Sequence, residues 1–376
     1  MRCLTRDYLQ QYSFGGKPLR SESNCEQAPE NFKNLPNDEF ERNYLQMVVR
    51  VSVVILNFNG EVFVKDLMIS LSKQTFKDFE VVFVDNASAD NSITELQNII
   101  ENKCFQGTRV KIILNHSNLG YCAGNNVGLA NSQGEYVVFL NNDTFVAPDW
   151  LEQLVRVLDR HSSVGACQSR IIFAQTNKVQ TAGNLFDVYG WSLGIKEEQN
   201  PDINTIGLFY PSGTSVIVRR NILDVCKGFD KLIFAGDYDL GWRIRLFGYQ
   251  VATSNRSKCY HYGSYATRTL YAHPEQFYQA CRERIYVLLK NYSFSRIVLR
   301  IPISIVFMFL ASIVWCWRTR KDYLTSLSKA VVWNLKNFDK LATKRKRIQR
   351  ERKVRDDEIE KSMSRYPLVI LLAKYL

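Results

Sequence analysis

Two amides and a carboxylate directly follow a run of apolar residues in the middle of the chain. Tyr136–Leu140 are all aliphatic or aromatic, which predicts a strand buried on both faces, as in a parallel sheet covered by helices. The run stops at Asn141-Asn142-Asp143. Residues two apart in a strand point to the same side, and open parallel sheets bind ligands beyond the carboxyl ends of their strands. We therefore expect Asn141 and Asp143 to project into a ligand crevice.

Three earlier apolar runs also end in Asn or Asp, and each is followed by a segment with helical periodicity. Strands that alternate with helices form a parallel sheet, so the polar strand ends should meet along one edge of that sheet. The predicted strands are 51–56, 79–84 and 110–114, followed by Asn57, Asp85 and Asn115, and the predicted helices are 61–74, 91–103 and 121–131.

The glycine-rich loops that commonly hold nucleotide phosphates are missing from the sequence. Neither G-x-G-x-x-G nor G-x-x-x-x-G-K-[ST] occurs. A divalent metal on a carboxylate is the usual substitute, so Mg²⁺ or Mn²⁺ is the expected cofactor.

The second half of the sequence is less regular. A helix should open at Asp237, since acidic residues in a first turn are favoured by the helix dipole. Strands are predicted for 164–173, 213–218 and 251–253, with a loop-rich insertion at 183–211.

The cysteines and the N-terminus indicate where the protein resides. Nine cysteines are scattered singly without a C-x-x-C pair, which argues against a zinc site or a disulfide framework and favours a reducing, cytoplasmic setting. The first residues lack the apolar core of a signal peptide. Residues 1–46 are polar and interrupted by Gly and Pro, so we expect a loosely structured extension there.

Taken in order, the motifs of residues 50 to about 292 resemble glycosyltransferase family 2, which has the GT-A fold, and particularly its rhamnosyltransferase-like members. Val53–Asn59 resembles the family's opening strand and turn, and Asp85–Asp90 its second-strand motif. Further similar segments are Asn118-Leu119-Gly120 with Gly124–Gly128 (N-x-G…G-N-N-x-G), Asn141-Asn142-Asp143 (the N-x-D form of D-x-D) and Gly228-Phe229-Asp230 with Gly236–Leu240 (G-F-D…E-D-x-D-L).

The resemblance implies a role for each of these positions. Asp143 and His261 would bind the metal, which would stabilise the charge of the leaving nucleoside diphosphate. Asp237 would be the general base that takes a proton from the acceptor hydroxyl, with Asp239 as a supporting carboxylate, and attack from the opposite face would invert the anomeric carbon. The nucleotide-sugar donor would be bound by Asn57, Asn59, Asp85, Asn118, Gly120, Asn125, Asn141 and Asn142.

The sequence departs from the family pattern at Gly236, where the family has Glu. This removes either a like charge that would raise the pKa of the base or a hydrogen-bond acceptor for the acceptor sugar, and Asp239 could share the work. The departure also leaves open a catalytically weak domain that acts as a membrane-associated scaffold of a glycan assembly complex. Gln279-Ala280-Cys281-Arg282-Glu283 is similar to the Q-x-x-R-W of processive synthases but ends in Glu, which favours a single transfer.

Some of these positions have structural alternatives. Asp85 and Asp90 could cap the helix that follows, and we favour nucleotide contact for Asp85 and capping for Asp90. Dipole compensation is the rival role for Asp237 and Asp239. Gly124 and Gly128 could serve close helix packing as well as substrate approach.

The C-terminal third combines an apolar segment with a basic tail. Residues 301–317 carry no charge but would form a helix of only roughly 25 Å at ~1.5 Å per residue, short of the ~30 Å membrane core. Arginines flank both ends, so we prefer a helix lying in the inner leaflet over a spanning helix or a buried core helix. Residues 324–348 predict an amphipathic helix that becomes basic at Lys344–Arg347, either a membrane-surface helix or a packing helix.

The net charge of +12 is concentrated in that tail. Arg318–Tyr366 hold 16 Lys and Arg against 7 Asp and Glu. The block lacks interleaved aromatic residues and the body has no basic bias, so nucleic acid is not an expected partner.

The sequence thus predicts an α/β protein with a GT-A domain, a Rossmann-like, mostly parallel sheet flanked by helices, and a C-terminal helical, membrane-associated extension. We expect a metal-dependent inverting transferase that moves one sugar from a nucleotide-sugar donor, with dTDP-rhamnose as first guess, to a glycan or lipid-linked acceptor in cell-surface polysaccharide synthesis. It would be peripheral or monotopic at the cytoplasmic face of the cell membrane, bound through 297–360; the oligomeric state is not predicted. The predicted divisions are an extension 1–46, a GT-A domain 47–292 with a nucleotide-binding half 47–145 and an acceptor-binding half 146–292, and a helical region 293–376.

Overall fold

A computed structural model describes residues 49–364, except 102–104, 106, 196–204, 235 and 264–272. These described residues form one compact unit. The predicted N-terminal extension, 1–46, and the end of the chain, 365–376, lie outside the described residues.

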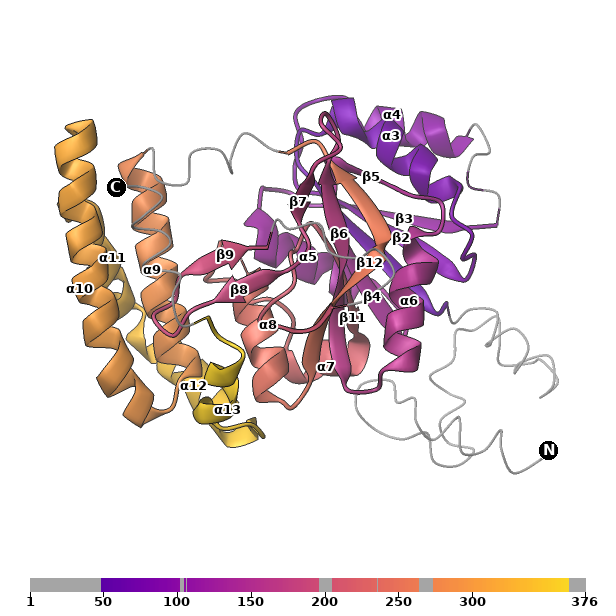
Figure 1. Ribbon diagram of the computed structural model, residues 1–376. Coiled ribbons are helices and arrows are strands. Elements are labelled where there is room, and N and C mark those ends of the chain that lie inside the picture. Colours follow the sequence, from indigo (N-terminus) through magenta and orange to yellow (C-terminus); the bar gives the residue numbers. More distant parts are fainter. Residues whose placement is uncertain are drawn as a thin grey trace, which may run out of the picture. The chain divides into compact units, whose positions relative to one another are not determined.

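A ten-stranded sheet forms the centre of the fold (Figure 1), in the order β10-β12-β6-β11-β4-β1-β2-β3, with β5 paired to β12 and β7 to β6. Neighbouring strands from β4 to β3 run parallel, as do β12 and β6, whereas β11 runs antiparallel between β4 and β6. The predicted mostly parallel α/β sheet is therefore confirmed. Its strands are β1 (Val51–Asn57), β2 (Phe79–Asp85), β3 (Arg109–Leu114), β4 (Tyr136–Asn141), β5 (Thr144–Val146), β6 (Val164–Phe173), β7 (Val179–Thr181), β10 (Thr205–Leu208), β11 (Ser215–Arg219) and β12 (Gln250–His261).

Helices cover both faces of the sheet because its central strands are apolar on both sides. Val53 and Ile55 of β1 pack with the helices of one face, and Val54, pointing the other way, packs with those of the opposite face. The first face carries α3 (Glu61–Ser72), α4 (Ser92–Glu101) and α6 (Trp150–Arg160), and the second α5 (Gly120–Ala130), α7 (Arg220–Cys226) and α8 (Asp237–Leu246).

Strand β12 is much longer than the predicted strand 251–253. Its polar continuation reads as a loop in the sequence, but Ser254, Asn255 and Ser257 are buried in the structure. Ser257 bonds with Ser169 of β6 and donates to the Trp150 carbonyl, so burial leaves its hydroxyl paired. This continuation carries the chain to His261.

The loop-rich insertion contains short elements of its own. The strands β8 (Asn184–Phe186) and β9 (Ser192–Gly194) form a separate antiparallel hairpin, and β10 adds an edge to the main sheet. The predicted boundary at 145/146 falls inside β5, which pairs with β12, so the two predicted halves share one sheet.

The C-terminal helices form a layer beside the hairpin β8–β9 (Figure 1). Among the described residues, α10 is the helix long and apolar enough to cross a membrane. At 26 residues it spans about 39 Å at ~1.5 Å per residue, so the predicted length of 17 residues was too short. The helices are α9 (Pro274–Asn291), α10 (Phe294–Thr319), α11 (Leu324–Lys336), α12 (Phe338–Glu351) and α13 (Asp356–Lys361).

The predicted amphipathic helix 324–348 is divided at Asn337 into α11 and α12. Its basic block faces the body of the protein through three side chains. Lys344 pairs with Asp230, Arg345 donates to the Leu289 and Tyr292 carbonyls, and Arg347 donates to the Cys226 carbonyl. These three contacts agree with the packing alternative for this part of the helix.

Candidate functional site

The carboxyl ends of β1, β2 and β4 meet, as the polar strand ends predict. The side-chain amide of Asn57 donates to Asp85 Oδ1 at 3.0 Å and accepts from Asn142 Nδ2 at 2.8 Å. Gly60 makes this contact possible, because a Cβ at that position would lie 2.2 Å from Asn142 Nδ2. The three predicted donor-binding residues therefore form one hydrogen-bonded cluster, and Gly60 is a member that the sequence analysis did not single out.

The loop after β2 holds Asp85 and Asn59 in place. Ser88 donates its N–H to Asp85 Oδ2 and its hydroxyl to Oδ1, and Asn59 accepts from the Ala89 N–H. Asp90 accepts from the backbone N–H groups of Ser92 and Glu61, at the starts of α4 and α3. Burial opposes its ionisation, but the hydrogen bond from the Ser92 hydroxyl, together with those from the two backbone N–H groups, keeps the pKa of Asp90 lowered. The geometry thus supports capping by Asp90 and a strand-end position for Asp85.

A second group of amides links β2 to the start of α5. Asn86 donates to Asn118 Oδ1 at 2.8 Å and accepts from Asn115 Nδ2 and the Leu119 N–H. Asn118 also accepts from the N–H of Gly120, whose φ of +76° suits glycine. Asn118 and Gly120 therefore shape the turn that precedes α5. Asn86, which the sequence analysis included only within the motif Asp85–Asp90, makes the hydrogen bonds that connect this turn to Asn115.

Helix α5 lies unusually close to the sheet. A Cβ on Gly124 would lie 2.5 Å from Leu56, and one on Gly128 would lie 2.2 Å from Val54. This supports the packing alternative for both glycines. Asn125 is buried and donates to the Tyr121 carbonyl within the same helix.

Asp143 and His261, 118 positions apart in the sequence, are in contact. His261 Nε2 lies 3.1 Å from both carboxylate oxygens of Asp143, and both residues are buried. The contact arises because Thr144 of β5 pairs with His261 of β12. The predicted metal ligands are thus brought together. Asn141, at the end of β4, is half-buried.

The other ring nitrogen of His261 has a partner that the sequence analysis missed. Nδ1 lies 2.8 Å from Oε1 of Gln180, a residue of β7. A carbonyl oxygen accepts from an N–H, so this bond favours the tautomer that leaves Nε2 free to bind a ligand. No sequence motif marks Gln180; only the pairing of β7 with β6 brings it to this place.

Asp237 lies at the same edge of the sheet. Its Oδ2 accepts from the Gly213 N–H at 2.9 Å, and the next residue, Thr214, accepts from the backbone N–H of Asn141. Burial, and secondarily the negative charge of Glu283, raise the pKa of Asp237. A raised pKa moves a carboxylate towards the range in which it works as a general base.

Asp239 points away from that edge into a buried ionic cluster. Its carboxylate contacts Arg243 at 2.7 Å and Lys290 at 2.7 Å, and Lys290 also binds Asp230 at 2.6 Å. Burial opposes their charge, yet Arg243 and Lys290 keep the pKa of Asp239 lowered, and Lys290 and Lys344 do the same for Asp230. Breaking a buried ion pair costs about 3–5 kcal/mol, so this cluster anchors α8 on α9. The predicted support by Asp239 would then be positional.

A mostly parallel sheet with an inserted antiparallel strand, and a carboxylate–histidine pair at its ligand edge, defines a GT-A glycosyltransferase fold. Two solved structures share it. Mannosyltransferase PcManGT from Pyrobaculum calidifontis, in complex with GDP-Man and Mn²⁺, is 16% identical with a TM-score of 0.51, covering 94% of this chain and 92% of its own. GalNAc-T7, with UDP, GalNAc and Mn²⁺, is 12% identical with a TM-score of 0.53, covering 77% and 57%.

Sequence comparison points to the same class of protein. Residues 52–226, just under half of the chain, match the model of glycosyl transferase family 2. An uncharacterized glycosyltransferase of Haemophilus influenzae is 26% identical over 50% of this chain and 56% of its own length. The amylovoran biosynthesis glycosyltransferase AmsB of Erwinia amylovora is 25% identical over 54% and 66%. The chain therefore spans less than two thirds of the length of these relatives.

Proposed function

We propose that this chain transfers a single sugar from a nucleoside-diphosphate donor to a hydroxyl of a glycan or lipid-linked acceptor, with inversion, in the synthesis of a cell-surface polysaccharide. The observation that carries the proposal is the buried contact between Asp143 and His261 at the ligand edge of the sheet. The match of residues 52–226 to glycosyl transferase family 2 supports the reaction class, and the name of AmsB, a protein of amylovoran biosynthesis, supports the product class.

The chemistry of the donor set fits a divalent cation. Two neighbouring ligands of an octahedral ion, each at ~2.1 Å, lie about 3 Å apart, and His261 Nε2 and Asp143 Oδ1 are separated by 3.1 Å. In the described part of the chain no group of three or more His, Cys, Asp or Glu surrounds a metal position. The protein would therefore supply two ligands, and the remaining positions would be taken by the donor diphosphate and water. A nitrogen in the set is compatible with Mn²⁺ as well as Mg²⁺.

Different residues would have different roles in sugar transfer. A metal bound by Asp143 and His261 would neutralise charge on the leaving diphosphate. The cluster of Asn57, Asp85 and Asn142 would face the nucleotide. The Gly213 N–H holds one oxygen of Asp237, which leaves the other to take the proton of the acceptor hydroxyl.

A donor screen tests the proposed function. Purified chain would be incubated with UDP-, GDP- and dTDP-sugars, with Mn²⁺, with Mg²⁺ or with chelator, and release of nucleoside diphosphate would be followed. We expect metal-dependent turnover with one class of donor, and dTDP-rhamnose is the first to try because of the rhamnosyltransferase-like motifs. Absence of turnover and of donor binding with every metal would favour the scaffold alternative instead.

Replacing Gln180 with alanine should weaken metal binding without abolishing it. The side chain orients His261, and loss of such a partner of a metal-binding histidine typically costs 10- to 100-fold in affinity. Titration of Mn²⁺ by electron paramagnetic resonance measures this without turnover. Gln180→Glu keeps the acceptor oxygen and should retain tight binding. Gln153→Ala, the same change on α6, should have no effect, and equal affinity in Q180A would refute the role of Gln180.

We further propose that α10 and α11 bind the protein to an anionic membrane surface, with the helices lying in the leaflet. Ser304, Met308 and Ser312 form the buried side of α10, and Ser304 donates to the Tyr189 carbonyl, so this helix is attached to the body along one face. Large apolar side chains cover the outer face, among them Phe294 (76% exposed), Trp317 (71%) and Leu335 of α11 (68%). A helix attached in this way lies along a membrane more readily than across it.

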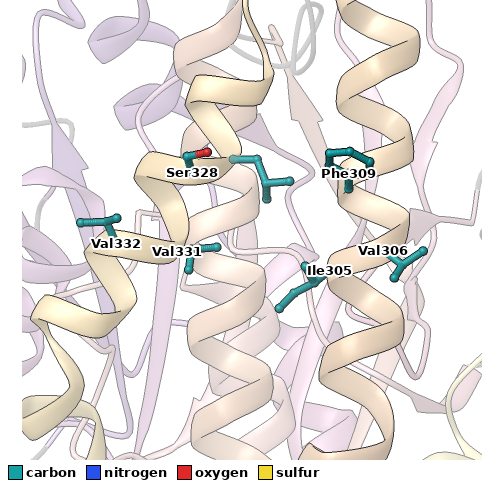
Figure 2. A pocket seen from close by; sticks show the side chains of 7 residues that line it. Ile305, Val306, Phe309, Ser328, Val331 and Val332 are labelled. Carbon is teal, nitrogen blue, oxygen red and sulfur yellow. The ribbon is translucent and has the colours of Figure 1, made fainter.

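An apolar groove runs between the two helices (Figure 2). Ile305, Val306 and Phe309 line it from α10, and Leu327, Ser328, Val331 and Val332 line it from α11. The cations at Arg320, Lys329 and Lys336 are exposed on the same two helices or at their ends. Apolar side chains together with exposed cations match acyl chains beneath anionic headgroups.

Vesicle binding tests this surface. We expect wild-type protein to sediment with phosphatidylglycerol vesicles and far less with phosphatidylcholine vesicles. Trp317→Asp combined with Leu335→Asp should lower binding at least tenfold, because two charges would enter the apolar layer. The control is Val62→Asp, an equally exposed apolar position on α3, which should bind as wild type. Unchanged binding of the double variant would exclude α10 and α11 as the contact.

A further inference from the structure

The position that departs from the family pattern has no room for a side chain. Gly236 lies immediately before α8, and a Cβ there would lie 2.6 Å from Cys122 Sγ and 2.8 Å from Phe229 Cδ1. Both neighbours are buried, so neither can move aside cheaply. The space beside Asp237 is closed to a carboxylate that comes from its own loop.

A carboxylate approaches the same place from another helix. Glu283 of α9 is 4% exposed, and α9 packs against α8. One oxygen of Glu283 accepts from the backbone N–H of Phe234 and from Arg282 at 3.2 Å, and the other accepts from the Tyr238 hydroxyl at 2.9 Å. Glu283 therefore contacts one residue that precedes Asp237 in the sequence, Phe234, and one that follows it, Tyr238.

The carboxylate of Glu283 affects the ionisation of Asp237, in addition to binding the backbone next to it. The groups that face Asp237 are Tyr121 and Cys122 of α5, the Gly213 N–H and Glu283. Asp239, on the same helix, is neutralised by Arg243 and Lys290. Glu283, although paired with Arg282, is the negative charge that adds to the effect of burial in raising the pKa of Asp237.

We propose that Glu283 supplies, from α9, the carboxylate that is missing at Gly236, and that it is the positioning residue for the base Asp237. This inference rests on the proposed function. It gives Glu283 two effects: it fixes the backbone that presents Asp237, and it keeps that carboxyl protonated to higher pH. It also explains why a chain with glycine at the family's Glu position can retain an acceptor site.

The test separates charge from hydrogen bonding. Glu283→Gln keeps an acceptor for the Phe234 N–H and a partner for the Tyr238 hydroxyl but removes the charge. Tyr238→Phe keeps the charge and removes one hydrogen bond. Glu275→Gln, at an exposed position near the start of α9, is the matched control. Near-UV circular dichroism would verify that each variant is folded.

Two readouts are needed, one of which does not require turnover. The ionisation of Asp237 would be followed by ¹³C NMR of aspartate-labelled protein, with Asp237→Asn to assign the signal. We expect its pKa to fall in E283Q and to be unchanged in Y238F and E275Q. Sugar transfer should show the same change, with the acidic limb of the pH–kcat profile moved to lower pH by a similar amount.

Three results would overturn the proposal: a pKa of Asp237 that does not change in E283Q, an equal fall in Y238F, or an unmoved pH profile. Failure of the proposed function would look different. In that case wild type would show no transfer with any donor, while the NMR titration would still report whether Glu283 controls Asp237.

Discussion

Asp143→Ala is expected to lower kcat/KM for sugar transfer by about 100- to 1,000-fold, the usual effect of removing one preorganised stabiliser of developing charge. The carboxylate is buried against His261 and is one of only two protein groups in the described part of the chain that we assign to the metal. The remaining ligand, His261, would hold the ion too weakly to neutralise the leaving diphosphate.

The measurement is initial-rate kinetics over a range of Mn²⁺ concentrations. Excess metal should restore part of the lost rate, because the defect lies in metal binding. Asp224→Ala on the exposed side of α7 makes the same chemical change away from the site and should behave as wild type. Wild-type rates in D143A at low metal would remove Asp143 from the mechanism.

Asp237→Asn should lower kcat by about 100- to 10,000-fold and leave donor and metal binding intact. Asparagine can still accept from the Gly213 N–H, so the start of α8 should keep its geometry, but an amide cannot take a proton from the acceptor. Rapid-quench measurement of transfer, together with calorimetric titration of donor, separates the two effects.

The pH dependence of the wild type follows from the same residue. Because burial and Glu283 raise the pKa of Asp237, the base is protonated over a wider acidic range than a free aspartate, and kcat should fall earlier on acidification. The acidic limb should disappear in D237N, with Asp224→Asn as the control. A D237N enzyme with wild-type kcat would show that another group is the base.

The part of the fold that the sequence predicts well is the part built from uninterrupted apolar runs. β1, β2 and β4 are buried on both faces, and their composition alone identifies them. The ends of these strands were predictable for the same reason, since a parallel sheet brings them to one edge. The hydrogen bonds among Asn57, Asp85 and Asn142 follow from that topology.

The contact between Asp143 and His261 was predictable only through motif resemblance. The strand that carries His261 contains buried serines and an asparagine, whose polar pattern is typical of a loop. Their burial depends on partners such as Ser169 and the Trp150 carbonyl, which no local pattern reveals. Gln180 and Glu283 could not be found from local patterns either. Each acts on a residue far away in the sequence, His261 and Asp237 respectively, because tertiary packing brings them together.

In the C-terminal region the structure differs from the prediction made from hydropathy and charge. Hydropathy identified the apolar core of α10 but underestimated the helix, because Arg296 and Arg300 interrupt the apolar run without ending the helix. Both arginines pair with Glu360, which neutralises them on the surface of the body. Three basic residues of α12, Lys344, Arg345 and Arg347, likewise bind a buried acid or backbone carbonyls. Charge counted along the sequence therefore does not distinguish these paired side chains from the exposed ones.

The central claim is that Asp143 and His261 bind a divalent ion that in turn holds the donor diphosphate. Calorimetric titration of nucleoside diphosphate into wild type and D143A, each with and without Mn²⁺, tests it most directly. We predict that Mn²⁺ tightens binding to wild type by at least tenfold and has little effect on D143A. Equal affinity of wild type with and without Mn²⁺ would contradict the claim.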